Sequence, residues 1–234
     1  MKFRLLVSMI LGLAMSSAPA FAKAAAEPAK PVLPTFVNPD PSVEPENVLN
    51  LDLSNGGRVQ IRMMPQWAPN HVERIKTLAR QGFYNGIIFH RVIDGFMAQT
   101  GDPTGTGGGG SPLPDLKAEF NAMPHLRGTV SMARTDSPDT ANSQFFIVFY
   151  PRFALDRKYT VFGRVISGMD AVDQISRGEP PANPTKIVRA TLGDGSAALP
   201  PPPALSTSDS AAASDEASED DDISIQDLID SSSE

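Results

Sequence analysis

The sequence of 234 residues lacks cysteine altogether and holds only three histidines. Without cysteine the protein has no disulfide framework, no thiolate metal site and no lipid-modified N-terminal cysteine. The histidines stand far apart, at His71, His90 and His125, and no His-Glu-x-x-His pair occurs. That pair is a recurring signature of a catalytic zinc site. We therefore expect no metal ion in this protein.

The N-terminal region lacks a hydrophobic run long enough to cross a membrane. Its apolar run, residues 5–14, is well short of the roughly 20 residues that a spanning helix needs. The run follows Lys2 and Arg4 and precedes Ala20-Phe21-Ala22, which is the layout of a cleavable secretory signal. We predict a signal peptide over residues 1–22 and no membrane span after its removal. Export without cysteine favours the bacterial periplasm.

A concentrated basic region is missing as well. Residues 23–195 hold 18 basic and 17 acidic side chains, whereas residues 196–234 hold ten Asp or Glu and no Lys or Arg. Nucleic-acid binding depends on a basic face that neutralises phosphates. The sequence therefore excludes nucleic acid as a partner.

Composition divides the chain into one folded domain and its flanks. Residues 23–46 carry six prolines, which predicts an extended linker. Residues 47–195 form the domain, and we expect it to be a monomer. The tail over residues 196–234 begins with a proline run and continues with Ser, Ala, Asp and Glu, which is typical of disorder. Within it Ser224 could cap a short helix that places Ile225, Leu228 and Ile229 on one face, so the tail is either a solubility segment or a segment that folds on a partner or on the protein's own groove.

The domain shows many short strand patterns and two helix patterns. Alternating runs around Ser54–Gly57 predict a hairpin over residues 48–63, and apolar positions at helical spacing predict a helix from residue 69 to residue 80. A shorter helix is expected from Met169 to Ile175. This mixture predicts a mainly β fold, a closed antiparallel barrel with two α-helices. Further strands are predicted at residues 119–120, 128–133, 143–148, 159–165 and 186–192.

Residues 89–102 place an arginine, Arg91, and a glutamine, Gln99, around an apolar patch with a turn at Asp94-Gly95. The stretch is either a binding site or an ordinary hairpin with a solvated arginine. Residues 105–110 formally match the Gly-x-Gly-x-x-Gly pattern of dinucleotide sites. A proline-rich run follows instead of a helix, so we interpret the loop as one that lets another chain approach closely.

Taken together, the blocks resemble the cyclophilin family of peptidyl-prolyl cis/trans isomerases over residues 47–192. The resemblance implies an eight-stranded barrel capped by a helix at each end, with a peptide groove on its outer face. It rests on five motifs in the family's order, which are Phe89–Asp102, Gly105–Gly108, Ser131–Ala133, Ser143–Ile147 and Val161–Val165.

The resemblance assigns roles to nine residues. Arg91 is implied as the catalytic arginine, acting with Phe96 and Gln99. Substrate-binding positions are Met97, Ala133, Gln144, Phe146, Leu155 and Tyr159. The chain departs from many members at three places, with Arg134 for an asparagine, Phe153-Ala154 where a tryptophan precedes the pocket leucine, and Tyr159 for a histidine; Ala154 argues against tight cyclosporin binding.

These assignments predict an enzyme that accelerates rotation about X-Pro bonds in exported, proline-containing polypeptides and needs no cofactor. The alternative is a chaperone or scaffold that binds prolyl peptides without turnover. A hydrolase ranks third among the hypotheses. It is the least favoured, because Ser131, Ser143 and His125 form no Gly-x-Ser-x-Gly elbow.

Overall fold

The computed structural model describes residues 35–196. The predicted signal peptide, the first part of the predicted linker and the acidic tail beyond Ser196 lie outside the described residues. Described residues form eight strands, two α-helices and two short 3₁₀ turns. The strands are β1 (Val48–Leu53), β2 (Arg58–Met63), β3 (Arg91–Ile93), β4 (Met97–Thr100), β5 (Thr129–Met132), β6 (Phe145–Val148), β7 (Val161–Ser167) and β8 (Ile187–Leu192); the helices are α1 (Pro69–Arg80) and α2 (Met169–Asp173); the 3₁₀ turns are η1 (Pro45–Asn47) and η2 (Phe153–Leu155).

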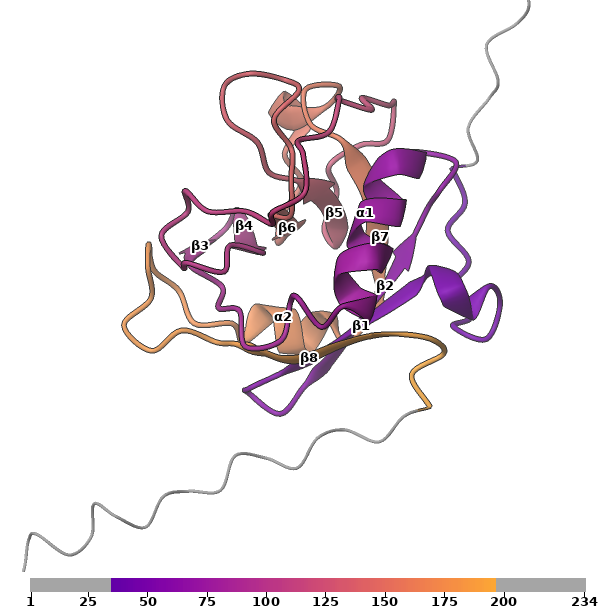
Figure 1. Ribbon diagram of the computed structural model, residues 1–234. Coiled ribbons are helices and arrows are strands. Elements are labelled where there is room, and N and C mark those ends of the chain that lie inside the picture. The colour runs from indigo at the N-terminus through magenta and orange to yellow at the C-terminus, as the bar shows by residue number, and fades with distance from the viewer. Residues whose placement is uncertain (1–34, 197–234) are drawn as a thin grey trace, which may run out of the picture. The chain divides into compact units, whose positions relative to one another are not determined.

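All eight strands belong to one antiparallel sheet in the order β3-β4-β6-β5-β7-β2-β1-β8. Figure 1 shows this order as a strongly curved sheet that runs from β3 and β4 on the left to β1 and β8 below. The mainly β prediction and the two helices are confirmed. The number of strands agrees with the eight-stranded fold that the resemblance implies.

The prediction of a closed barrel is wrong. Within residues 35–196 the edge strands β3 and β8 share no ladder, and only the isolated bridges Ile88–Lys186 and Val92–Gly178 span the opening. The segment before β8 carries Pro180, Pro181 and Pro184, whose nitrogens have no hydrogen to donate to a ladder. The sheet is an open half-barrel.

The predicted strand at residues 119–120 is also absent from the described structure. The Glu119 side chain instead accepts hydrogen bonds from the backbone nitrogens of Asn70 and His71 at the start of α1. A carboxylate at this helix end stabilises the positive end of the helix dipole. Glu119 therefore caps the N-terminal end of α1 and takes no part in the sheet.

The main core lies on the concave side of the sheet, where α1 packs against β8 and α2 against β2. Val72, Ile75 and Leu78 repeat at helical spacing along α1 and are almost completely buried. Pro69 starts this helix, where its missing N–H costs nothing. Gly82 follows it at φ +69°, a conformation that favours glycine.

Part of the predicted linker lies on the domain. The guanidinium of Arg62, a buried residue of β2, donates hydrogen bonds to the backbone carbonyls of Asn38, Asp40, Val43 and Glu44. A single arginine thus satisfies four carbonyls of a segment with little secondary structure. The chain is held against the sheet before β1 begins.

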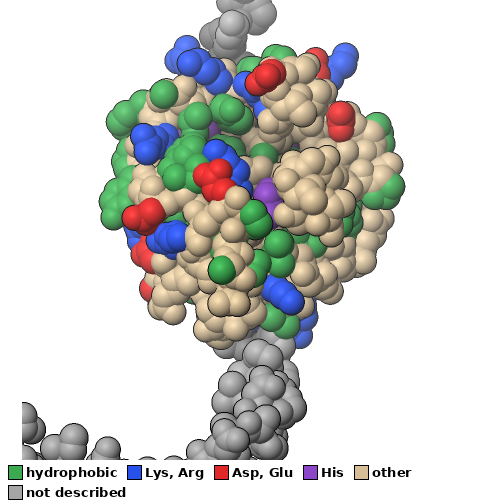
Figure 2. Space-filling view, turned by 90° about the vertical axis from the view of Figure 1, so that its left-hand side faces the viewer, with side chains coloured by type: hydrophobic (Ala, Val, Ile, Leu, Met, Phe, Trp, Pro, Cys, Tyr) green, Lys and Arg blue, Asp and Glu red, His purple; other side chains and the backbone are tan. Residues whose placement is uncertain are grey.

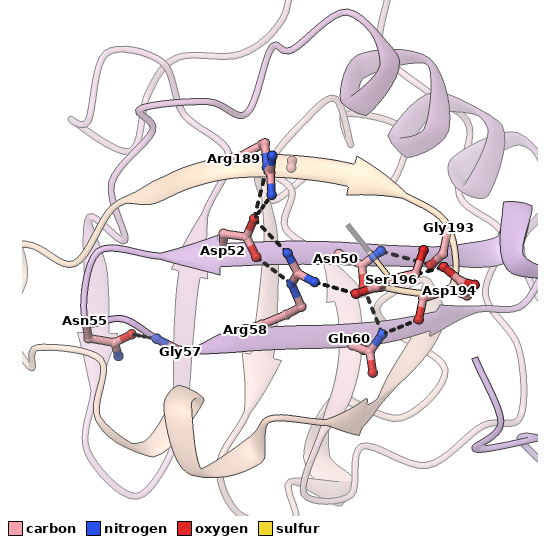
Figure 3. A network of polar contacts seen from close by, with 12 residues as sticks. Asn50, Asp52, Asn55, Gly57, Arg58, Gln60, Arg189, Gly193, Asp194 and Ser196 are labelled. Carbon is pink, nitrogen blue, oxygen red and sulfur yellow. Dashed lines mark hydrogen bonds and ion pairs between the residues drawn. The ribbon is translucent and has the colours of Figure 1, made fainter. Parts of the chain in front are cut away.

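A second polar network holds the other end of the described chain (Figure 3). The buried carboxylate of Asp52 accepts hydrogen bonds from Arg58 at 2.6 Å and Arg189 at 3.0 Å. Next to it, side chains of β1 and β2 bind the backbone after β8: Asn50 Nδ2 to Gly193 O at 2.9 Å, Arg58 Nη1 to Gly195 O at 2.6 Å and Gln60 Nε2 to Asp194 O at 3.2 Å. The end of the described chain therefore lies beside β1 and β2. Among the described residues, no helix has the length and hydrophobicity to cross a membrane.

Candidate active site

Strand register aligns three predicted site residues. Arg91 of β3 pairs with Gln99 of β4, and Gln99 pairs with Phe146 of β6. Directly opposed residues point to the same face of a sheet, so the three side chains form one row. Their neighbours in sequence, such as Ala98 and Ile147, point to the other face and join the main core. The register therefore brings two residues of the stretch 89–102, Arg91 and Gln99, onto one face with Phe146.

A small apolar cluster covers the outer face around this row. Met97, Phe146 and Val148 are buried there, apart from the main core. Partly buried side chains complete the cluster, which are Ile93, Phe96, Ala133, Leu155 and Tyr159. A second cluster on the outer face of a sheet is not needed to fill the core, and it provides an apolar surface for a ligand.

This cluster encloses a pocket of about 120 Å³. Of the nine predicted site residues, the pocket brings eight together and leaves out Gln144. It adds Arg134, which sequence reasoning treated only as a departure from the family pattern. The lining is Arg91, Phe96, Met97, Gln99, Ala133, Arg134, Phe146, Leu155 and Tyr159.

The guanidinium of Arg91 stands at the edge of the pocket and reaches solvent. Its Nε lies 3.4 Å from Oε2 of Glu179, and both side chains are about half exposed. Glu179 is brought there by the bridge between Val92 and Gly178, with N–O distances of 2.8 and 2.9 Å. Exposed ion pairs of this length are weak, so Arg91 is free to move onto a ligand. No sequence signal points to Glu179, which is 88 residues away from Arg91.

Gln144 lies beside the pocket and connects it to the glycine loop. Gln99 Nε2 donates to Gln144 Oε1 at 2.8 Å, and Gln144 Nε2 donates to the carbonyls of Gly107 and Gly109 at 2.9 and 2.7 Å. These residues line a neighbouring hollow of about 460 Å³. The pocket and the hollow share Gln99, Ala133 and Arg134, so together they suit an extended chain.

The glycine loop is held by the buried carboxylate of Asp102. It accepts hydrogen bonds from the backbone nitrogens of Thr104 at 2.8 Å, Gly107 at 2.6 Å and Gly109 at 3.1 Å. Burial alone would raise the pKa of Asp102, but the hydrogen bonds from Thr104, Gly109 and Gly107 outweigh burial and lower the pKa. No helix follows the loop within residues 103–128, in agreement with the rejection of a dinucleotide site.

The ring of Phe146 rests on a buried histidine. His125 stacks on Phe146 with ring centres 6.1 Å apart and meets Tyr159 edge-on at 6.5 Å. Its Nδ1 lies 2.9 Å from Oδ1 of Asp156, and burial lowers the pKa of His125 although Asp156 opposes this. A neutral imidazole therefore supports two walls of the pocket from behind.

Ser131 completes a Ser-His-Asp arrangement with these residues, because its Oγ lies 3.2 Å from Nε2 of His125. Such an arrangement is the geometry of a hydrolase triad. However, Ser131 and His125 are both 0% exposed, and the Ser131 hydroxyl donates to the carbonyl of Thr160 at 2.9 Å. A substrate cannot reach this hydroxyl, so the geometry argues against the hydrolase hypothesis.

Arg134 forms the far rim of the pocket. Its guanidinium lies 4.5 Å from the ring centre of Tyr159 and donates to the carbonyls of Lys158, Thr135 and Asp136 at 2.7 to 3.1 Å. Arginine makes several such bonds at once because its five N–H groups form a rigid fork. This residue therefore fixes the position of Tyr159 and of two loops.

Comparisons with known proteins point to one family. Residues 48–192 match the family model of the cyclophilin type peptidyl-prolyl cis-trans isomerase/CLD. The chain is 48% identical over 167 residues to a probable peptidyl-prolyl cis-trans isomerase of Brucella suis, covering 64% of this chain and 85% of that protein. It is 42% identical over 143 residues to peptidyl-prolyl cis-trans isomerase-like 1 of Aspergillus fumigatus, covering 57% and 88%.

Solved structures give the same result. Cyclophilin AquaCyp293 from Hirschia baltica superposes with a TM-score of 0.60 at 32% identity, over 65% of this chain and 77% of that one. A cyclophilin type peptidyl-prolyl cis-trans isomerase of Cryptosporidium parvum, solved in the presence of the dipeptide Ala-Pro, gives a TM-score of 0.58 at 27% identity, over 62% and 98%. The row of site residues, the outer pocket and these matches lead to one conclusion: the chain belongs to the cyclophilin-type peptidyl-prolyl cis-trans isomerases.

Proposed function

We propose that this isomerase binds the proline ring of an X-Pro segment in the 120 Å³ pocket and uses Arg91 to stabilise the rotating amide. The observation that carries the proposal is the row of Arg91, Gln99 and Phe146 across three strands. It places a cation, a polar side chain and an aromatic wall around one small pocket. The activity needs no nucleophile, proton transfer or cofactor.

Arg91 acts on the state in which amide conjugation is lost. Rotation about a peptide bond has a barrier of ~18–20 kcal/mol. At the twisted state the prolyl nitrogen becomes pyramidal and regains a lone pair, which a guanidinium N–H binds better than the planar amide. A charge-assisted hydrogen bond contributes about 1.5–3 kcal/mol, or one to two powers of ten in rate.

The rest of the acceleration comes from holding the chain. Phe96, Met97 and Phe146 surround the ring, while Gln99 and the neighbouring hollow hold the backbone on the other side of the bond. Fixing both sides favours twisted conformers and excludes the water that solvates the planar amide. The exposed ion pair between Arg91 and Glu179 is weak, so the guanidinium at the pocket edge is free to turn toward a ligand.

Proline-containing polypeptides are the proposed partners. The Ala-Pro dipeptide present with the Cryptosporidium parvum relative supports this class of ligand. The signal-like residues 1–22 support a role on exported proteins in the periplasm. A mature N-terminus at Lys23 in a periplasmic fraction, read by mass spectrometry, tests the location, and an uncleaved chain in the cytoplasm contradicts it.

The deciding experiment compares Arg91→Ala with a matched control, Arg80→Ala. Arg80 is likewise about half exposed and paired with a carboxylate, but it lies on α1 away from the pocket. In an NMR exchange assay on a prolyl peptide, we expect Arg91→Ala to lower kcat/KM about 10- to 100-fold. Arg80→Ala should leave kcat/KM unchanged.

Equal rates for Arg91→Ala and the unmodified chain contradict the assigned role. No rate gain for the unmodified chain over buffer favours the binding chaperone or scaffold instead. Unfolding temperatures of both variants serve as the folding control.

A further inference from the structure

One surface beside the pocket is not explained by isomerisation. The segment from Tyr150 to Lys158 follows β6, and its Leu155 lines the pocket. Tyr150 and Phe153 are 60% and 63% exposed, among the most exposed large hydrophobic side chains in the described domain. Two solvent-facing aromatic rings so close in sequence mark a surface that is available for contact.

The same segment carries three cations. Arg152, Arg157 and Lys158 are exposed, and none of them has a carboxylate partner within residues 35–196. Arg152 lies over the ring of Phe96 at 5.1 Å, directly on a pocket wall. We call this surface the basic rim, defined as Tyr150, Arg152, Phe153, Arg157 and Lys158.

The only carboxylate inside this segment does not neutralise the rim. Asp156 accepts hydrogen bonds at 2.9 Å from the backbone nitrogen of His125 and contacts the same residue's ring. Its charge is therefore directed toward the domain interior. A partner of the rim must supply negative charges together with apolar side chains.

The chain itself contains a segment of that chemistry. Residues 215–222 hold six Asp or Glu, and the following residues bring Ile223, Ile225, Leu228 and Ile229. Residues 196–234 contain no Lys or Arg that would oppose the approach. The tail segment thus combines acidic with apolar side chains, and the basic rim combines basic with aromatic side chains.

The tail is long enough to reach the rim. Asp215 stands 19 residues after Ser196, and the backbone just before Ser196 is fixed beside β1 and β2 (Figure 3). At ~3.3 Å per residue, 19 residues span ~60 Å. A domain of this size has a radius of gyration of ~15 Å, so every point of its surface lies within reach.

We propose that residues 215–229 bind the basic rim of their own domain and compete with substrate for the mouth of the pocket. The competition with substrate rests on the proposed function, because the rim borders the proline pocket. The docking of the tail on the rim is independent of that function. A tethered segment acts at an effective concentration of the order of mM, so weak contacts suffice. Exposed ion pairs are screened by salt, which makes the docking strongly dependent on ionic strength.

The first experiment keeps the full chain and removes acidic charge from the tail. We compare the unmodified protein with Asp220→Asn/Asp221→Asn/Asp222→Asn and with a chain ending at Ser196. The family match ends at residue 192, so the shorter chain keeps the whole matched domain. At ~20 mM salt we expect both variants to show kcat/KM about threefold higher or more, through a lower KM; at ~0.5 M salt the difference disappears.

The second experiment changes the rim in the full chain. Arg157→Asn/Lys158→Gln removes two charges, and asparagine tolerates the φ of 60° at residue 157. Neither side chain lines the pocket. We expect the same gain in kcat/KM as for the tail variant. Lys117→Gln/Lys186→Gln, which removes two exposed charges outside the rim, is the matched control and should change nothing.

A readout independent of catalysis separates docking from isomerisation. Amide NMR signals of Phe153 and Leu155 should differ between the full chain and the tail variants at low salt and coincide at high salt. If neither chain isomerises prolyl peptides, this comparison still decides the docking. Identical signals and identical kcat/KM at every salt concentration overturn the proposal, and a dependence on protein concentration overturns it in favour of docking onto a second copy.

Discussion

Arg134 holds several parts of the site in place although its side chain is only partly buried. Family members usually have asparagine at this position. The longer arginine of this chain donates to the carbonyl of Lys158 and stacks on the ring of Tyr159. Tyr159 itself stands where many members carry a histidine. The two departures are in contact, so they act as one unit: the ring forms the pocket wall and the guanidinium holds the ring.

We predict that Arg134→Gln weakens substrate binding more than it slows the chemical step. Loss of the carbonyl bonds and of the cation–π contact frees Tyr159 and widens the pocket, so KM should rise about three- to tenfold with little change in kcat. Arg134→Lys keeps a positive charge over the ring but lacks the planar fork of N–H donors. Its KM should therefore lie between those of the unmodified protein and Arg134→Gln. Steady-state kinetics on a prolyl peptide measure both constants.

Arg157→Lys serves as the control for Arg134→Lys, because it changes an exposed arginine outside the pocket lining. An unchanged KM for Arg134→Gln shows that the guanidinium does not position Tyr159. A lower unfolding temperature with unchanged kinetics assigns Arg134 a purely structural role.

At the scale of elements, the site depends on three strands and one loop. The strands β3, β4 and β6 align the row, and the loop over residues 103–110 supplies the carbonyls that orient Gln144. The loop has no regular secondary structure, and Asp102 at its base satisfies several of its N–H groups. Two side chains, Asp102 and Gln144, thus hold the loop through its backbone N–H and carbonyl groups.

Replacing that carboxylate should loosen the loop. Asp102→Asn turns one acceptor oxygen into a donor, which removes the charged acceptor either of the Thr104 N–H or of the N–H groups of Gly107 and Gly109. We expect the free energy of unfolding to fall by about 1–3 kcal/mol and KM to rise. Urea unfolding and isomerase kinetics measure the two effects.

Asp170→Asn is the matched control, since Asp170 is an exposed residue of α2 outside the pocket lining. If Asp102→Asn is as stable as Asp170→Asn, the loop is held by other contacts and this account of it fails.

Local patterns allowed the hairpin of β1 and β2, the helix α1 and the turn at Asp94-Gly95 to be predicted from sequence. Each depends on residues close together in the chain, through alternation, helical spacing or turn chemistry. The grouping of Met97, Phe146 and Leu155 required the family resemblance, because strand pairing across 50 residues is not visible in local periodicity.

The failures arose where tertiary contacts decide the outcome. The apparent strand at Glu119 gives way to a helix-end contact with Asn70 and His71. The barrel stays open because prolines interrupt the segment before β8. Glu179 and the clamp by Arg134 follow from the path of loops, which a single sequence does not specify.

For the whole molecule, charge is divided between a nearly neutral domain and an acidic tail. Figure 2 shows Lys, Arg, Asp and Glu side chains dispersed over one face of the domain, with hydrophobic side chains gathered on its left part. The net charge of −7 comes largely from residues 196–234. Most of the negative net charge therefore lies in the tail, whereas all three histidines lie in the domain.

The domain buries all three of its histidines, with 0% exposure for His71 and His125 and 4% for His90. Burial lowers the pKa of each, partly opposed by Glu119 at His71, by Asp102 at His90 and by Asp156 at His125. A histidine with a lowered folded-state pKa binds fewer protons in the folded than in the unfolded chain. Its stabilising contribution is thus complete above the unfolded pKa of ~6.5 and is lost as the pH falls below it.

We therefore predict that the free energy of unfolding is nearly constant between pH 7 and pH 8 and falls steadily from about pH 6.5 to pH 5. Each histidine that stays neutral in the folded state contributes a slope of about 1.4 kcal/mol per pH unit. Urea unfolding at a series of pH values measures the curve. His125→Gln should reduce the slope by one histidine's share, whereas a curve that is flat or rises toward pH 5 shows that the buried imidazoles take up protons without loss of the fold.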